Sequence, residues 1–312
     1  MAEVSIARPS SARREWRSPQ GRREALWALF FLAPSLLGFL VFYWLPILAG
    51  LLLGFFEWDL LSDPEWAGTA NFQRLFTDTG LRQALLNTLY FTIVTVPVGM
   101  VMALIIALAL NQRMRGTKWY RTAYFMPVVA TVVASALVWK WMFLPVYGLI
   151  NNILAFLHLP QPQWLSSPEW AMPAIIIFSI WLRLGYNIVL FLAGLQAIPR
   201  DLYEAASVDG ANSWAQFWHV TLPLLSPTTF LILILSLISS FQVFDQVLVM
   251  TGQSQPGGPR GAAITMVFYI YTNAFRLSRM GYASAVAMVL FLIIFAITII
   301  QLRLQRRWVY YD

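Results

Sequence analysis

The sequence has no cysteine and few charged residues, and each shortage excludes a class of protein. Without cysteine in 312 residues, a disulfide scaffold and a thiol enzyme are excluded. The two histidines, His158 and His219, stand far apart with no metal-ligand partner at useful spacing, so a zinc enzyme is excluded too. Charged residues make up 11% of the chain, whereas soluble domains have about 25%. So little polar surface cannot cover a globule in water.

Catalytic motifs are also missing. The chain contains no G-x-x-x-x-G-K-[ST] phosphate loop, and Gly116-Thr117-Lys118 is only a fragment of one. No serine lies in a G-x-S-x-G context. The sequence therefore predicts that the chain is not an enzyme and that any ATP used with it is hydrolysed by another chain.

What the sequence does have is long apolar runs. Hydrophobic residues make up 59% of the chain, and the mean hydropathy is +0.65. A helix crosses the roughly 30 Å hydrocarbon layer with about 20 apolar residues. We therefore predict an all-α polytopic membrane protein with six transmembrane helices, near Leu26–Phe56, Leu85–Leu110, Thr122–Leu144, Met172–Leu195, Leu224–Met250 and Tyr282–Leu302.

The first apolar run could also be read as a cleaved signal peptide. It is longer than the usual 7–15 residues of such a segment and comes after a long arginine-rich leader. We therefore expect it to be retained as a span.

Basic residues indicate which side of the membrane each loop faces. They concentrate before the first span, after the second and fourth spans and in the C-terminal tail, so both termini are expected to be cytoplasmic. Because this excess is split among flanks, it does not indicate nucleic-acid binding. The residues on the predicted inner side are Arg8, Arg13, Arg14, Arg17, Arg22, Arg23, Arg113, Arg115, Lys118, Arg121, Arg200, Arg303, Arg306 and Arg307.

The predicted outer loops have a different composition. The first is acidic and contains Glu57, Asp59, Asp63 and Glu65. The loop over residues 145–171 has no lysine or arginine but carries Trp164 and Trp170. Tryptophans near span ends are typical of the membrane interface, so we interpret both as anchors.

The loop between spans four and five, residues 198–227, predicts a helix, a turn and a second helix. Pro199 suits a helix start, Gly210 suits a left-handed helix stop, and Ser213 can cap the second helix. A helix this short is marginal alone in water, so it must dock on something. Shape alone leaves two alternatives open, a partner-binding hairpin and a loop lying on the membrane surface.

This loop carries a family resemblance. It has the pattern E-A-A-x-x-D-G-A, then a phenylalanine, then V-x-L-P-L-L-x-P, and so resembles the signature loop of the permease subunits of ABC importers. Arg121–Pro127 resembles the third-span entry of these permeases. The stretch from Leu32–Pro34 to Asn71–Phe72 resembles the carbohydrate-type branch, and within it the first of the paired permeases, of the maltose and glycerol-phosphate type. The matching loop positions are Glu204, Ala205, Ala206, Asp209, Gly210, Ala211, Phe217, Leu222, Pro223, Leu224, Leu225 and Pro227.

The resemblance implies a type I importer permease fold with a cytoplasmic coupling helix between helices four and five. It implies a second permease subunit, two ATPase subunits that bind ATP and Mg, and an extracytoplasmic solute-binding protein. This chain itself would need no cofactor, and it would lie in the cytoplasmic membrane of a bacterium or archaeon. Its solute would be a sugar or sugar-like compound. Glu204 would pair with a basic residue of the ATPase, and Gly210 would make the turn.

The expected organisation has four parts. They are a basic N-terminal tail (1–24), the first helix with its outer loop (25–83), the core permease domain (84–302, with the coupling loop at 198–227) and a C-terminal tail (303–312).

Polar residues inside spans are candidates for the solute pathway, because such groups normally face the bundle interior. Ser179, Arg183 and Tyr186 share a helix face, and Ser236 and Ser240 are four residues apart. Structural roles, an ion pair for the arginine and helix packing for the serines, remain open. Weaker candidates are Asn187 and Gln242, whereas Lys140 and Asp245 are expected to pair with each other or to reach the membrane interface.

Two other classes remain possible. An ATPase-independent secondary transporter or channel would suit Arg183 and the span prolines Pro97 and Pro127, but it leaves the 198–227 loop unexplained. We find no inverted repeat of the kind many such transporters contain. The third class is a membrane-embedded scaffold without transport.

Overall fold

The computed structural model describes residues 19–112, 124, 126–252 and 255–308. The chain divides into two compact units, Met1–Leu53 and Gly54–Asp312. In the first unit, α2 (Pro19–Phe39), a π-helical turn η1 (Leu40–Trp44) and α3 (Leu45–Leu53) form one continuous apolar helix. A helix that is apolar all round suits a lipid environment or the interior of an assembly.

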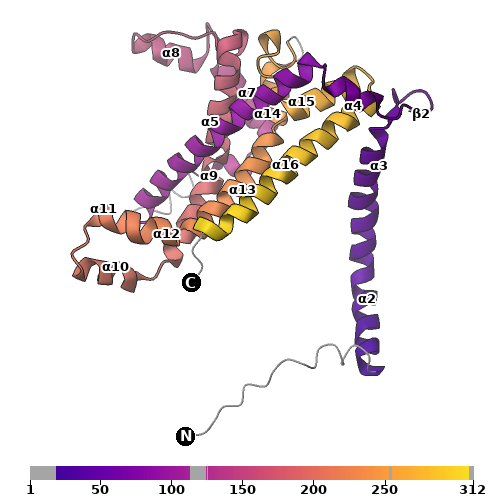
Figure 1. The fold of residues 1–312 in the computed structure, drawn as a ribbon. Coiled ribbons are helices and arrows are strands. Elements are labelled where there is room, and N and C mark those ends of the chain that lie inside the picture. Colours follow the sequence, from indigo (N-terminus) through magenta and orange to yellow (C-terminus); the bar gives the residue numbers. More distant parts are fainter. Residues whose placement is uncertain (1–18, 113–123, 125, 253–254, 309–312) are drawn as a thin grey trace. The chain divides into compact units, whose positions relative to one another are not determined.

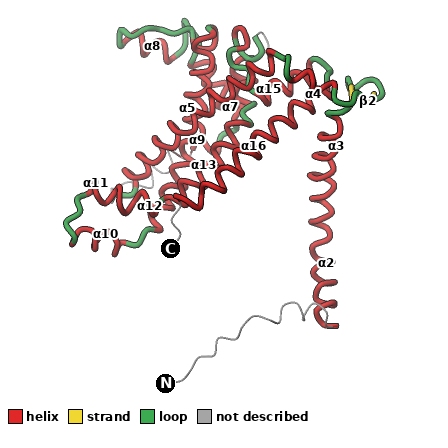
Figure 2. The backbone as a smooth tube through the Cα atoms, viewed as in Figure 1, coloured by secondary structure: helices red, strands yellow, loops and turns green. Residues whose placement is uncertain are grey.

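The second unit is a bundle of long helices (Figures 1 and 2). Its apolar spans are α5 (Thr79–Leu110), α9 (Pro168–Ala197) and α16 (Met280–Trp308). Together with Gln20–Leu53 in the first unit, they are the four described helices long and apolar enough to cross a membrane. These four confirm the spans predicted near Leu26–Phe56, Leu85–Leu110, Met172–Leu195 and Tyr282–Leu302, with ends shifted by several residues.

A bent helix pair supplies a possible fifth span. The segments Ser213–Leu224 and Ser226–Phe241 are together long and apolar enough for one span, and they meet at 62°. The first contains α11 (Ser213–Gln216), the π-helical η3 (Phe217–Thr221) and α12 (Leu222–Leu224), and the second is α13. The predicted third span, Thr122–Leu144, begins outside the described residues and continues as the short α7 (Val132–Met142).

The prediction of one continuous helix over Leu224–Met250 is wrong. The chain leaves the helix after Phe241, and α14 (Asp245–Thr251) starts separately. Phe244 has an extended φ of −143°. Buried backbone groups outside a helix need other partners. The carbonyl of Val243 finds one in the buried hydroxyl of Thr265, at 2.9 Å.

Short elements connect the spans. A two-stranded antiparallel hairpin pairs Phe56 with Trp66. The π-helical turn η5 extends α15. The remaining elements are β1 (Phe56–Glu57), β2 (Glu65–Trp66), α4 (Ala70–Leu75), α8 (Leu149–Phe156), η2 (Trp164–Ser166), α10 (Arg200–Val208), η4 (Pro259–Gly261), α15 (Met266–Tyr271) and η5 (Thr272–Arg276).

The core of the second unit lies around α9. One side of α9 packs with α7 and α14 through Phe178, Ile175 and Val247, and another packs on α5 and α13 through Phe191 and Leu195. In Figure 1, α10 and α11 lie at the same end of the bundle as the C-terminal end of α16. Helices α4, α8 and α15 lie at the opposite end.

Candidate functional site

The loop that carries the signature pattern folds as a hairpin of two helices at one end of the bundle. Its first helix, α10, has no buried residue. Tyr203 and Ala206, three residues apart, are half-buried and form its inner face, whereas Glu204 and Ala205 are exposed. No described residue forms a hydrogen bond or an ion pair with the Glu204 side chain. The carboxylate of Glu204 is therefore open to a partner.

Gly210 makes the turn, as predicted. Its φ is +82°, in the left-handed region that favours glycine. The N–H of Ala211 donates to the carbonyl of Ala206 at 2.9 Å, and the N–H of Gly210 donates to that of Ser207 at 3.1 Å. These two bonds form a Schellman motif, which satisfies the last carbonyls of α10. Asp209 is the C-cap of α10 and is exposed.

The second helix of the hairpin starts differently from the prediction. Asn212, not Ser213, is the N-cap of α11, and its Oδ1 accepts a bond from the N–H of Ala215 at 2.9 Å. Asparagine caps as well as serine does, so composition could not separate the two. Phe217 comes next, in η3, half-buried between the rings of Trp214 and Trp218.

A polar cavity lies inside the bundle among α5, α9 and α13. Its volume is about 20 Å³, room for about one water molecule, so a solute would need the surrounding helices to move apart. Three predicted pathway residues, Arg183, Ser236 and Ser240, line it together with Asn187. Arg183 is near the middle of the 30-residue α9, and no described residue forms an ion pair or a hydrogen bond with its guanidinium. The arrangement therefore offers several hydrogen-bond donors to a polar solute.

The same cavity includes polar residues that the sequence did not single out. Thr95, Ser239 and Gln246 also line it. Thr95 is only 6% exposed, and its buried hydroxyl has no hydrogen-bond partner among the described residues. A buried unpaired hydroxyl normally finds a water or a ligand. Threonine on an apolar helix carries no sequence signal of its own, which is why Thr95 was missed.

Two predicted pathway residues do not line this cavity. Ser179 donates to the carbonyl of Ile175 at 2.7 Å, a bond back to its own helix, and it accepts a long bond of 3.4 Å from Gln246. Tyr186 is 45% exposed and lies outside the lining, as does the exposed Gln242.

Lys140 and Asp245 do not pair with each other. The ammonium of Lys140 donates to the carbonyl of Val249 near the C-terminal end of α14, at 3.2 Å. Asp245 is exposed in the first turn of that helix. Each charge therefore sits at the end of the α14 dipole that stabilises it.

Trp164 is not an interface anchor. It is only 7% exposed, packs against Phe143, and donates from Nε1 to Oδ1 of Asn151 at 2.7 Å. Trp170, in contrast, is exposed, in agreement with the prediction. The loop without lysine or arginine supplied no cue to tell the two rings apart.

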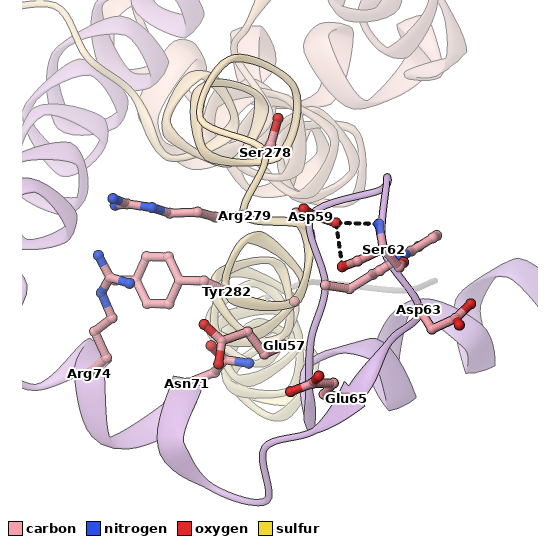
Figure 3. A pocket seen from close by; sticks show the side chains of 12 residues that line it. Glu57, Asp59, Ser62, Asp63, Glu65, Asn71, Arg74, Ser278, Arg279 and Tyr282 are labelled. Atoms are coloured by element: carbon pink, nitrogen blue, oxygen red, sulfur yellow. Dashed lines mark hydrogen bonds between the residues drawn. The ribbon is translucent and has the colours of Figure 1, made fainter.

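The acidic first loop lines a pocket (Figure 3). Oδ1 of Asp59 accepts bonds from the N–H groups of Leu61 and Ser62 and from the Ser62 hydroxyl. The backbone bond from Ser62 and then that from Leu61 lower the pKa of Asp59 to about 2. Across the pocket, the guanidinium of Arg74 lies 4.6 Å from the ring centre of Tyr282. The pocket therefore carries both signs of charge on one surface.

The comparison with known families identifies the core of the chain. Residues 78–310 match the model of the binding-protein-dependent transport system inner membrane component. That match begins at Asp78, the N-cap of α5, and includes the hairpin and the polar cavity.

Individual relatives match over nearly the whole chain. The lactose transport system permease protein LacF of Rhizobium radiobacter is 38% identical over 275 residues, which are 87% of this chain and 91% of LacF. The probable ABC transporter permease protein YesP of Bacillus subtilis (strain 168) is 36% identical over 294 residues, 93% of this chain and 94% of YesP. The trehalose/maltose transport system permease protein MalF of Thermococcus litoralis is 35% identical over 286 residues, 91% of this chain and 95% of MalF.

A solved structure agrees with these relatives. A chain of a bacterial ABC transporter involved in the import of the acidic polysaccharide alginate superposes with a TM-score of 0.80 at 26% identity. The match covers 94% of this chain and 99% of that one. The chain is thus a multi-pass membrane protein with the type I ABC importer permease fold, and it belongs to the inner-membrane components of binding-protein-dependent transport systems, among the permeases of carbohydrate ABC importers.

Proposed function

We propose that this permease forms, with a second permease subunit, the membrane pathway for a sugar or sugar-like solute delivered by a binding protein. The relatives support the solute class, because their names specify lactose and trehalose/maltose. A related alginate transporter has been solved in complex with its solute-bound periplasmic protein. An ATPase-independent carrier would not need the surface hairpin.

The observation that carries the proposal is the exposed Glu204 on a helix with no buried residue. An unpaired carboxylate on a nine-residue helix is suited to a basic partner residue. A hydrogen bond to a charged group contributes roughly 1.5–3 kcal/mol, enough to hold such a helix in a partner's cleft. We infer that two ATPase subunits, which bind ATP and Mg, dock here and that α10 is the coupling helix.

The same geometry bears on sidedness. The hairpin and the C-terminal end of α16 share one end of the bundle, which also carries Arg200 and Arg303, whereas the acidic β1–β2 segment lies at the other (Figure 1). Basic residues favour the cytoplasmic side. This supports a cytoplasmic hairpin and a cytoplasmic C-terminal tail. We further propose six spans in all, a cytoplasmic N-terminus, and tail and core boundaries at 24, 83 and 302.

The solute pathway includes the polar cavity. Arg183, Asn187, Ser236 and Ser240 would bind the solute, with Thr95 as a further contact. Ser179 and Tyr186 would act only indirectly or at the surface facing the second permease.

The test is uptake by the assembled complex. Glu204→Gln removes the charge at almost unchanged volume, so the variant should insert in the membrane yet lose ATP-driven uptake and retain less ATPase on co-purification. Glu24→Gln, outside the hairpin, serves as the control. Normal uptake and normal ATPase retention in Glu204→Gln would contradict the proposal.

A further inference from the structure

The two arms of the hairpin are joined by side-chain hydrogen bonds at two separate levels. Near the turn, Nε2 of Gln216 on α11 donates to the hydroxyl of Ser207 on α10 at 2.8 Å and to the carbonyl of Ala211 at 3.2 Å. The Ser207 hydroxyl in turn donates to the carbonyl of Tyr203 at 2.8 Å. These bonds connect α11 to the side chain of Ser207 and, through that hydroxyl, to the backbone of α10.

The second level lies toward the membrane-embedded helices. The hydroxyls of Tyr203 and Thr221 are 3.0 Å apart and share a hydrogen bond. Thr221 is 5% exposed and ends the π-helical turn η3, directly before α12 and the bend into α13. The Tyr203 hydroxyl therefore connects the exposed helix to a buried point at the base of a span.

These bonds matter because little else holds α10. None of its residues is buried, and a helix of nine residues is marginal by itself. Without cross-links between the arms, a push on α10 would be absorbed by bending at Gly210 or at Pro199. With them, α10 and η3 move as one body.

We propose that Gln216 and the Tyr203–Thr221 pair are positioning residues that make the hairpin rigid, so that movement of a docked ATPase reaches α13 instead of bending the loop. The inference rests on the proposed coupling role of the hairpin. It assigns the transmission of force to residues on the inner side of the hairpin, whereas docking uses its outer side.

The experiment measures solute transported per ATP hydrolysed in proteoliposomes containing the full complex. Tyr203→Phe and Thr221→Val each remove one hydroxyl, and Gln216→Glu keeps the size of the side chain but removes both donated bonds. We expect each variant to retain the ATPase on purification and to hydrolyse ATP. The amount of solute transported per ATP hydrolysed should fall about fivefold, which corresponds to the net free energy of one hydrogen bond.

Matched controls separate this role from a general loss of fold. Thr221→Ser retains a hydroxyl and should restore the ratio. Tyr90→Phe and Gln163→Glu make the same chemical changes at exposed positions away from the hairpin and should leave it unchanged. The double variant Tyr203→Phe/Thr221→Val should be no worse than Thr221→Val alone, because Thr221→Val already removes the bond to Tyr203 together with the 3.4 Å bond from Thr221 to the carbonyl of Gln216.

The outcomes are distinguishable. If the unmodified complex does not retain an ATPase, the proposed function fails. If the complex retains the ATPase and the variants transport a normal amount of solute per ATP, the proposed role of these residues in making the hairpin rigid is wrong. The proposed function of the protein would still stand. Loss of the ATPase in Tyr203→Phe and Thr221→Val, with retention in Thr221→Ser, would also overturn the rigid-hairpin proposal. The Tyr203–Thr221 bond would then serve ATPase docking.

Discussion

The hydroxyl of Tyr269 donates to Oδ2 of Asp78 at 2.6 Å, across 191 residues of sequence. The Tyr282 hydroxyl donates to the same oxygen. The other oxygen, Oδ1, caps α5 by accepting the N–H groups of Gly80 and Leu81 at 2.8 and 3.2 Å. One carboxylate therefore joins the start of α5 to α15 and α16, at the end of the bundle opposite the hairpin.

This junction predicts a pH dependence. Burial alone would raise the pKa of Asp78, but the bonds from Tyr269, Tyr282, Leu81 and Gly80 outweigh it and lower that pKa. The stability that Asp78 contributes is therefore complete above its unfolded pKa near 3.9 and is lost as the pH falls through its lower folded value. Burial and then the bond to Asp78 raise the pKa of Tyr269 to about 12, so its contribution is lost as the pH rises from about 10 to about 12.

The variant Tyr269→Phe should remove the alkaline effect and weaken the acid one, because the bonds from Tyr282, Leu81 and Gly80 to Asp78 remain. We expect a loss of about 1 kcal/mol in stability at neutral pH, because the carboxylate is only half-buried. Thermal unfolding of the detergent-solubilised protein between pH 3 and 7 measures it, with Tyr271→Phe as the neighbouring control. Equal unfolding temperatures and equal pH profiles for Tyr269→Phe and the unmodified protein would contradict this role for Asp78.

The turn at Gly210 predicts the result of two substitutions. A methyl group at Gly210 would meet nothing within 4 Å, so the cost of Gly210→Ala comes only from the left-handed backbone. That cost is roughly 1–2 kcal/mol, and asparagine tolerates this conformation better. Uptake should fall clearly in Gly210→Ala and less in Gly210→Asn. The reverse order, or no effect of either, would show that the turn conformation is unimportant.

The unpaired guanidinium of Arg183 predicts a solute phenotype. Arg183→Ala should lower uptake about tenfold, in proportion to a lost hydrogen bond to a charged group, and Arg183→Lys should recover part of it. Basal ATP hydrolysis and thermal stability should stay close to normal, since no described residue loses a partner. Arg82→Ala, at an exposed position, is the control. A large drop in stability with unchanged affinity for the solute would instead mark a structural arginine.

Sequence reasoning reached the spans and the hairpin because both rest on local patterns. Apolar runs locate α5, α9 and α16, and the glycine at position 210 locates the turn. The break after Phe241 was missed although Gln242 and Asp245 interrupt the apolar run, because both were interpreted as polar residues within one span. The hydroxyl of Thr265, distant in sequence, satisfies the freed carbonyl of Val243.

The cavity was predicted in part for the same reason. Arg183, Ser236 and Ser240 stand out as polar residues inside apolar helices, but the cavity takes one side from α5, where Thr95 resembles any packing threonine. Helix spacing predicted that Tyr186 and Arg183 share a helix face. Spacing alone does not indicate which residues of that face contact the neighbouring helices, and Tyr186 does not line the cavity. Trp164 was misplaced because its partner, Asn151, lies 13 residues away in a separate element.

The most direct test of the coupling role is site-specific cross-linking, which the absence of cysteine makes possible. A single Ala205→Cys variant places a thiol on the exposed side of α10. Tyr147→Cys places one at an exposed position just before α8, a helix at the opposite end of the bundle. In the intact complex, a short bifunctional reagent should join position 205, but not position 147, to the ATPase subunit. Position 205 should also be protected from membrane-impermeant thiol reagents added outside the cell. Failure of position 205 to cross-link, or its labelling from outside, would contradict the account.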